Sequence, residues 1–139
     1  MKTRLINNEQ LFRFMNKQNP LSEKSYAFAL KIINTYKLLT NAKREYILSK
    51  QLLRSGTSIG ANVAEANGAI SKADFSAKIS IAYKESLETK YWLSILKDSD
   101  FIIVKDFQIL FEEADELSKI LFFNSKIYTH KTKLMTANC

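Results

Sequence analysis

Turn-forming residues are scarce in this chain, whose 139 residues include only three glycines and one proline. A β-sandwich or β-barrel needs many more turns than these residues supply, and an α/β fold needs glycine-bearing loops between its strands and helices. Apolar residues make up 46% of the chain and charged residues 25%, which is typical of a folded domain. The length fits one domain. The sequence therefore predicts an all-α domain with a few long helices.

Four segments carry apolar residues at the spacing of an amphipathic helix. They are residues 23–39 after a cap at Ser22, residues 43–66, the stretch between a cap at Ser71 and a turn at 97–100, and residues 104–128. In the third segment a heptad seam runs through Phe75, Ile79, Ala82, Ser86, Thr89, Leu93 and Leu96. Long helices joined by short turns predict an antiparallel, up-down-up-down four-helix bundle. We expect residues 1–21 to form an arm or a short helix, residues 22–128 the bundle, and residues 129–139 a flexible tail.

Positive charge is concentrated in the first part of the chain. The net charge is +7, and residues 1–60 hold 11 Lys and Arg against 3 Asp and Glu. Such a field either attracts a polyanion such as nucleic acid or serves solubility as a lysine-rich coat. The candidate nucleic-acid-binding residues are Lys43, Arg44, Lys50 and Arg54, of which Lys43, Lys50 and Arg54 share one face of the predicted second helix. Lys24, Lys31 and Lys37 form a comparable row on the first helix.

Residues that support catalysis or metal binding are rare. The single histidine, His130, and the single cysteine, Cys139, exclude most metal sites and catalytic triads built from these residue types. The spacing of Glu65, Glu85 and Glu88 does not require a carboxylate metal site. We therefore expect no enzymatic activity, no cofactor and no metal. The lone cysteine and the absence of a signal-peptide pattern or a long apolar stretch favour a cytoplasmic location without membrane insertion.

Polar residues interrupt the apolar seams of the second and third predicted helices. This polar layer comprises Ser55, Ser58, Asn62, Glu65, Glu85, Ser86, Glu88 and Thr89. It either fixes the register between helices, lines a channel between subunits or contacts a ligand. On the second helix, Gly56, Gly60 and Ala64 lie four residues apart and predict close approach by another helix or a ligand. The acidic residues Glu112, Glu113, Asp115 and Glu116 are expected to form a solvated face of the fourth helix.

Residues 48–68 and 71–96 resemble a known family, the four-helix-bundle proteins encoded in intervening sequences of bacterial 23S ribosomal RNA genes. The matching positions are Leu53, Arg54, Ser55, Ser58, Ile59, Asn62, Glu65, Ser71, Asp74, Phe75, Ala82, Ser86, Glu88, Thr89, Tyr91 and Leu93. The resemblance covers about residues 22–125. It departs from many relatives at residues 65–68, where the helix is expected to end slightly later.

The resemblance implies a left-handed four-helix bundle that assembles into a ring, typically a homopentamer. A related branch of the family serves as the accessory protein of diversity-generating retroelements, in which a basic barrel binds nucleic acid and a reverse transcriptase. Two apolar stripes on the first predicted helix also favour assembly, because a lone bundle would leave one of them exposed.

The function predicted first is a non-enzymatic oligomeric scaffold that binds RNA or structured nucleic acid through basic helix faces. The alternative is a self-assembling adaptor whose partner is another protein, such as a reverse transcriptase. A weaker third hypothesis is a small-molecule or carboxylate-metal site in the polar layer.

Overall fold

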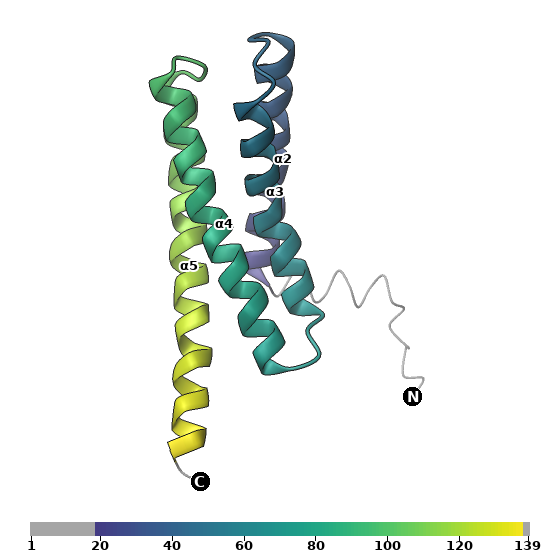
Figure 1. The fold of residues 1–139 in the computed structure, drawn as a ribbon, viewed down its shortest axis with the longest axis vertical. Coiled ribbons are helices and arrows are strands. Elements are labelled where there is room, and N and C mark those ends of the chain that lie inside the picture. Colours follow the sequence, from purple (N-terminus) through teal and green to yellow (C-terminus); the bar gives the residue numbers. More distant parts are fainter. Residues whose placement is uncertain (1–18, 138–139) are drawn as a thin grey trace, which may run out of the picture.

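The computed structural model describes the backbone of residues 19–137 and the side chains of residues 19–125. This part of the chain forms four helices and no strand: α2 (Pro20–Asn41), α3 (Leu48–Asn67), α4 (Lys72–Asp98) and α5 (Val104–Ala137). The prediction of an all-α, four-helix domain is confirmed. The α2–α3 and α4–α5 connections lie at one end of the molecule, and the α3–α4 turn lies towards the other end (Figure 1).

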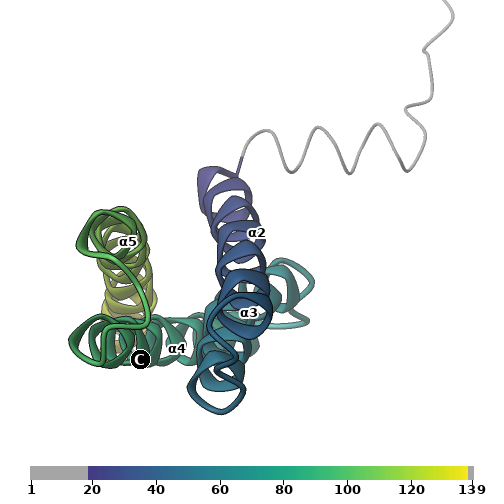
Figure 2. The ribbon, with the colours of Figure 1, turned by 90° about the horizontal axis from the view of Figure 1, so that it is seen from above.

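Each helix packs against the next one along the chain, and α2 also contacts α5. Seen from above, α4 crosses between α3 and α5 (Figure 2). The buried apolar side chains are Leu21, Phe28, Ile32, Leu39, Leu52, Ile59, Val63, Ala66, Ile79, Ala82, Leu93, Leu96, Ile102, Leu110, Ala114, Leu117 and Leu121. The heptad seam predicted for α4 is buried from Ile79 to Leu96, with Phe75 packed at its edge. The apolar spacing therefore identified the core face of this helix.

Three predicted helix ends differ from the structure. The cap of α2 is Asn19 and not Ser22, because Pro20, which has no N–H to satisfy, occupies the first turn. Helix α3 begins at Leu48 and not near Lys43. Helix α5 continues to Ala137, past the predicted end at residue 128, since no glycine or proline interrupts the sequence after residue 104. The backbone is thus helical over much of the segment expected to be a flexible tail, whereas most of the predicted arm at residues 1–21 lies outside the described residues.

Two further boundaries follow the sequence. The Ser71 hydroxyl accepts a hydrogen bond from the Asp74 N–H at 3.0 Å, as expected of an N-cap. Helix α3 ends at Asn67, with Gly68 as its C-cap, one residue later than predicted and in agreement with the departure from the family pattern. Within the described residues, every helix is too short or too polar to span a lipid bilayer.

Two of the three small residues on α3 lie against α2, as the spacing predicted. A Cβ atom added to Gly56 would stand 2.8 Å from side-chain carbons of the buried Ile32, and one added to Gly60 would stand 3.3 Å from the Ser25 carbonyl oxygen. The prediction is wrong for Ala64, whose side chain is exposed. Close packing of α3 on α2 therefore depends on the two glycines.

Candidate nucleic-acid interface

Basic residues along the side of α2 are neutralised by α5. Lys24 forms an ion pair with Glu116, and Lys31 forms one with Glu113. The acidic residues of α5 were expected to form a solvated face. Glu116 is exposed as expected, Glu113 is half-buried, and both carboxylates face lysines of α2. The predicted row of lysines on α2 is consequently not a free basic surface, and only Lys37 in it has no ion-pair partner among the described residues.

The third acidic residue of the cluster, Asp115, joins α5 to α4. Its carboxylate oxygens lie 2.6 Å from the Lys90 Nζ and 2.9 Å from the Lys119 Nζ. The hydrogen bond from Lys90, with that from Lys119, lowers the pKa of Asp115 to about 2. The Lys90 ammonium also lies 5.1 Å from the centre of the Phe111 ring, within the range of a cation–π contact. Asp115 therefore links α5 to α4 through its ion pair with Lys90.

Arg54, one of the four candidate nucleic-acid-binding residues, lies in an ion-pair network between α3 and α4. Its guanidinium pairs with Glu88 and lies 3.5 Å from the Glu85 carboxylate. The Trp92 Nε1–H donates to the same Glu88 oxygen at 3.1 Å. The second oxygen of Glu85, Oε2, is buried without a hydrogen-bond partner in the described structure. Arg54 thus joins α3 to α4 through these ion pairs. Its loss would leave the carboxylates of Glu85 and Glu88 without a neighbouring cation.

The other members of the polar layer are hydrogen-bonded within the bundle. The Ser55, Ser58 and Thr89 hydroxyls and the Asn62 amide donate to backbone carbonyls of their own helices. Glu65 pairs with Lys78 of α4 at 2.9 Å. The Ser86 and Ser118 hydroxyls lie 2.7 Å apart in the core between α4 and α5. The Glu65–Lys78 and Ser86–Ser118 contacts join two helices and favour the interpretation in which polar groups fix helix register. The other bonds satisfy polar groups within their own helices.

Ser118 is the residue of this layer that the sequence analysis did not single out. It lies next to Leu117 on the buried side of α5, and its hydroxyl also donates to the Ala114 carbonyl at 2.9 Å. A small polar residue beside a heptad position was the only signal in the sequence. Its role became visible only when Ser86 was placed opposite.

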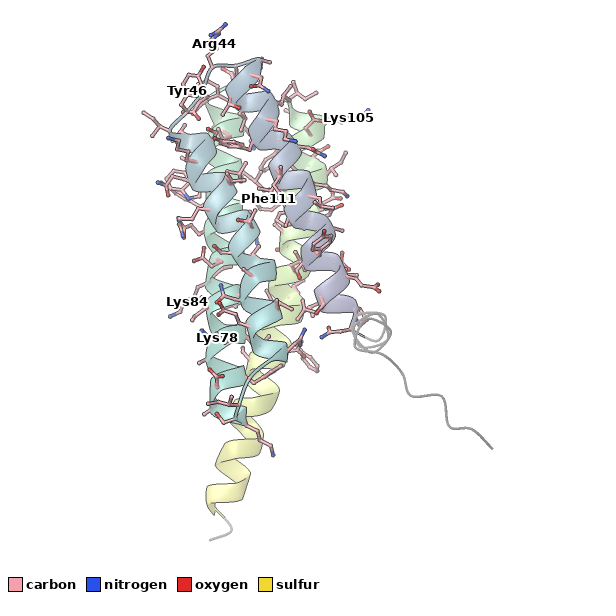
Figure 3. All side chains as sticks on the ribbon, turned by 90° about the vertical axis from the view of Figure 1, so that its right-hand side faces the viewer. Arg44, Tyr46, Lys78, Lys84, Lys105 and Phe111 are labelled. Carbon is pink, nitrogen blue, oxygen red and sulfur yellow. The ribbon has the colours of Figure 1, made fainter. Side chains whose placement is uncertain are left out.

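The predicted face shared by Lys43, Lys50 and Arg54 does not exist. Helix α3 begins at Leu48, so Lys43 and Arg44 lie in the connection between α2 and α3. Arg44 has a φ of 52°, a left-handed conformation that a residue inside an α-helix does not adopt. The structure nevertheless keeps these residues at one end of the bundle, where Arg44 extends from the tip (Figure 3).

This end, which we call the α2–α3 tip, comprises residues 37–50. Its basic side chains are Lys37, Lys43, Arg44 and Lys50, and all four are exposed. None of them has an ion-pair partner among the described residues. The segment holds a single carboxylate, Glu45. Elsewhere in the described residues most cations pair with carboxylates, and the unpaired ones, Lys72, Lys84 and Lys105, are spread along α4 and α5. The tip therefore differs from the rest of the bundle in having four unpaired cations close together in the sequence.

Glu45 offsets only one of the four positive charges of the tip, and its carboxylate is hydrogen-bonded to the start of α3 and not ion-paired with a basic side chain. Its oxygens accept backbone N–H bonds from Ile47 at 3.1 Å, Leu48 at 2.9 Å and Ser49 at 2.6 Å. Burial raises the pKa of Glu45, but the backbone hydrogen bonds outweigh burial and hold this pKa below its ordinary value. The charged carboxylate thus compensates the positive end of the helix dipole. Beside it, the Tyr46 ring is 50% exposed.

A metal centre finds no support in the described residues. They contain no group of three or more His, Cys, Asp or Glu side chains close enough to hold a metal ion. Glu65, Glu85 and Glu88 instead pair with basic residues of the bundle. The side chains of His130 and Cys139 lie outside the described residues.

Comparison with known families decides the relationship that the sequence suggested. The family model for the 23S rRNA-intervening sequence protein matches residues 17–122. This chain belongs to that family. Among solved structures, it is similar to a protein of the S23 ribosomal protein family from Bacteroides thetaiotaomicron, whose crystal structure is described as one of unknown function. The two are 44% identical with a TM-score of 0.75, and the match covers 76% of this chain and 98% of the other. Curated proteins gave no match.

The part of the chain that matches the 23S rRNA-intervening sequence protein family is nearly neutral. Residues 17–122 contain 15 Lys and Arg and 13 Asp and Glu. The net charge of this part therefore does not indicate a binding surface. The positions of the cations that lack an ion-pair partner are more informative. In the matched part, the α2–α3 tip is the place where four such cations lie within 14 residues of sequence.

Proposed function

We propose that this protein is a non-enzymatic scaffold that binds RNA or another structured nucleic acid at the α2–α3 tip. The supporting observation is the concentration of unpaired cations at this tip, namely Lys37, Lys43, Arg44 and Lys50. Cations elsewhere in the described residues are either ion-paired, as Lys24, Lys31 and Arg54 are, or unpaired but spread along α4 and α5. A cation without a carboxylate partner can approach a phosphate without first breaking an ion pair. Contacts with phosphates supply affinity without reading sequence. This replaces the basic helix faces expected from sequence with one end of the bundle.

The scaffold we propose is an antiparallel, left-handed bundle assembled as a cyclic homo-oligomer, with five subunits by analogy with the family resemblance. Exposed apolar side chains on the outer sides of two helices support assembly: Tyr26 and Leu30 on α2, and Leu87 and Tyr91 on α4. A ring would repeat the α2–α3 tip in each subunit. Weak contacts at each tip would then add through avidity.

The binding test compares two charge-reversal variants of the full chain in gel-shift titrations with a labelled stem-loop RNA at low salt. The first is Lys43→Glu with Arg44→Glu. The control is Lys72→Glu with Lys84→Glu, which changes the net charge equally at two exposed lysines. Lys72 is the first residue of α4, and Lys84 lies on the same helix away from the tip (Figure 3). We expect the tip variant to weaken binding by about tenfold or more and the control to weaken it much less. Wild-type protein that fails to shift RNA, or equal losses in both variants, would contradict the proposal.

The same exposed apolar side chains support a second candidate, a self-assembling adaptor for another protein. A pull-down from cell extract treated with nuclease separates the two functions. Recovery of one protein, such as a reverse transcriptase, by a chain that shifts neither RNA nor DNA would favour the adaptor. Loss of all partners after nuclease treatment would favour nucleic-acid binding.

A further inference from the structure

Tyr46 presents an aromatic ring to solvent among the unpaired cations of the tip. The residue is 50% exposed, and its ring and hydroxyl contact no other described side chain at stacking or hydrogen-bonding distance. Arg44 lies two residues before it, and both side chains extend from the same end of the bundle (Figure 3). A free aromatic face beside cations is the combination that proteins use to bind unpaired bases.

The backbone around Tyr46 is held on both sides, so the Cα atom that carries the ring has a fixed place at the tip. The Glu45 carboxylate accepts the N–H groups of Ile47, Leu48 and Ser49. The Glu45 N–H donates to the Leu39 carbonyl at 3.0 Å, and the Ser49 hydroxyl donates to the Glu45 carbonyl at 2.8 Å. A group fixed before binding loses less conformational entropy when it binds.

We propose that Tyr46 stacks on an unpaired base and makes the α2–α3 tip selective for single-stranded nucleic acid, meaning free strands, loops and ends. Bases inside a duplex are already stacked on both sides and cannot offer a face to the ring. Lys43, Arg44 and Lys50 would contact the phosphates next to the stacked base. This inference rests on the proposed function, since it adds selectivity to the same site.

Tyr26 provides a matched control for the stacking role of Tyr46. Its ring is 68% exposed on α2, but the lysines nearest to it in sequence along that helix, Lys24 and Lys31, are paired with carboxylates of α5. Removal of either ring deletes one exposed tyrosine. Only the ring at position 46 lies among unpaired cations.

The experiment measures binding of the full-length protein by fluorescence anisotropy with labelled oligouridylate, oligothymidylate and a duplex RNA of equal length. The proteins compared are wild type, Tyr46→Ala, Tyr46→Phe and Tyr26→Ala. We expect Tyr46→Ala to lose about tenfold in affinity for the single strands and little for the duplex. Unchanged duplex binding would show that the variant is folded and that its basic side chains still bind phosphates. We expect Tyr46→Phe to bind as wild type does. We expect Tyr26→Ala to keep the wild-type ratio of single-strand to duplex affinity, because any weakening of assembly at Tyr26 would lower avidity for all three probes alike.

The outcomes separate this inference from the function on which it rests. If wild type bound single strands and duplex equally and Tyr46→Ala changed neither, stacking would be overturned while binding at the tip would stand. A loss in Tyr26→Ala that was confined to the single strands, as in Tyr46→Ala, would also overturn it. If wild type bound none of the three probes, the proposed function would fail with it. Loss on only one of the two single strands would restrict the site to RNA or to DNA and would support stacking.

Discussion

Gly60 of α3 lies against the backbone of Ser25 of α2, so closely that a Cβ atom at position 60 would be 3.3 Å from the Ser25 carbonyl oxygen. A glycine in the middle of a helix costs about 1 kcal/mol relative to alanine. The close approach of two helix backbones explains why that cost is tolerated here. The Ser25 hydroxyl donates to the Ser22 carbonyl and is buried at the same contact.

We predict that Gly60→Leu lowers the free energy of unfolding by about 1–3 kcal/mol or more, because its side chain would have to displace the backbone of α2. Gly60→Ala should cost less, since improved helix propensity offsets part of the crowding. The control is Ala64→Leu, one turn further along α3 at an exposed position, which we expect to change stability by less than about 0.5 kcal/mol. Urea unfolding of the three variants measures these differences. Equal stability of Gly60→Leu and wild type would contradict the packing described.

Arg54 provides a test of structural against binding roles. We predict that Arg54→Ala destabilises the protein by about 1–3 kcal/mol, because the Glu85 and Glu88 carboxylates lose their cation while Glu85 stays largely buried. Adding Glu85→Gln should recover part of that loss by removing one uncompensated charge. Thermal unfolding followed by the fluorescence of Trp92, whose indole N–H bonds to Glu88, would report both effects. No destabilisation by Arg54→Ala would mean that the ion pair does not hold the two helices.

Asp115 should make stability depend on pH in the acidic range. Its pKa in the folded protein is about 2, below the ordinary value of about 4 that applies to the unfolded chain. Between these values the unfolded state binds more protons, so the stabilisation is present above about pH 4 and is lost as the pH falls through about 2. We expect the stability difference between wild type and Asp115→Asn to shrink over that interval. An NMR titration of the Asp115 carboxyl that gave an ordinary pKa would contradict this.

The core of the bundle could be predicted from the sequence because apolar spacing alone defines it. The seam of α4, from Ile79 to Leu96, and the glycines of α3 were placed correctly. Spacing cannot show which charged side chains meet across two helices, and the acidic residues of α5 were therefore expected in solvent. Only the arrangement of helices reveals that Glu113 and Glu116 face the lysines of α2.

The start of α3 was misplaced because the signal there is not an apolar pattern. The N-cap residue is Ile47, whose apolar side chain cannot cap the helix. The Glu45 carboxylate, two residues earlier, accepts hydrogen bonds from three backbone N–H groups in its place. Arg44 adopts a left-handed φ, a conformation that is usually indicated in a sequence by glycine. The prediction of a basic face on α3 assumed that the helix begins near Lys43, and it was therefore wrong. Lys43, Arg44 and Lys50 nevertheless lie together at the tip.

Assembly is predicted from apolar side chains that the single chain leaves exposed, namely Tyr26 and Leu30 on α2 and Leu87 and Tyr91 on α4. We expect light scattering to give a defined multiple of the 16.0 kDa chain, five-fold by analogy with the family. Tyr91→Glu should reduce the oligomer, because a charge would replace an apolar contact, whereas the exposed Lys72→Glu should not. A 16.0 kDa species alone at micromolar concentration would contradict the prediction.

The dependence of nucleic-acid affinity on salt tests the central claim most directly, since each phosphate contact by a cation releases a counterion. The two variants to compare are Lys43→Gln with Arg44→Gln, which removes two unpaired cations of the tip, and Lys24→Gln with Lys31→Gln, which removes two paired ones. Our account predicts that the slope of log K against log salt becomes shallower by about 1–2 in the first variant and stays that of wild type in the second. An equal change in both slopes, or no change in the first, would contradict it.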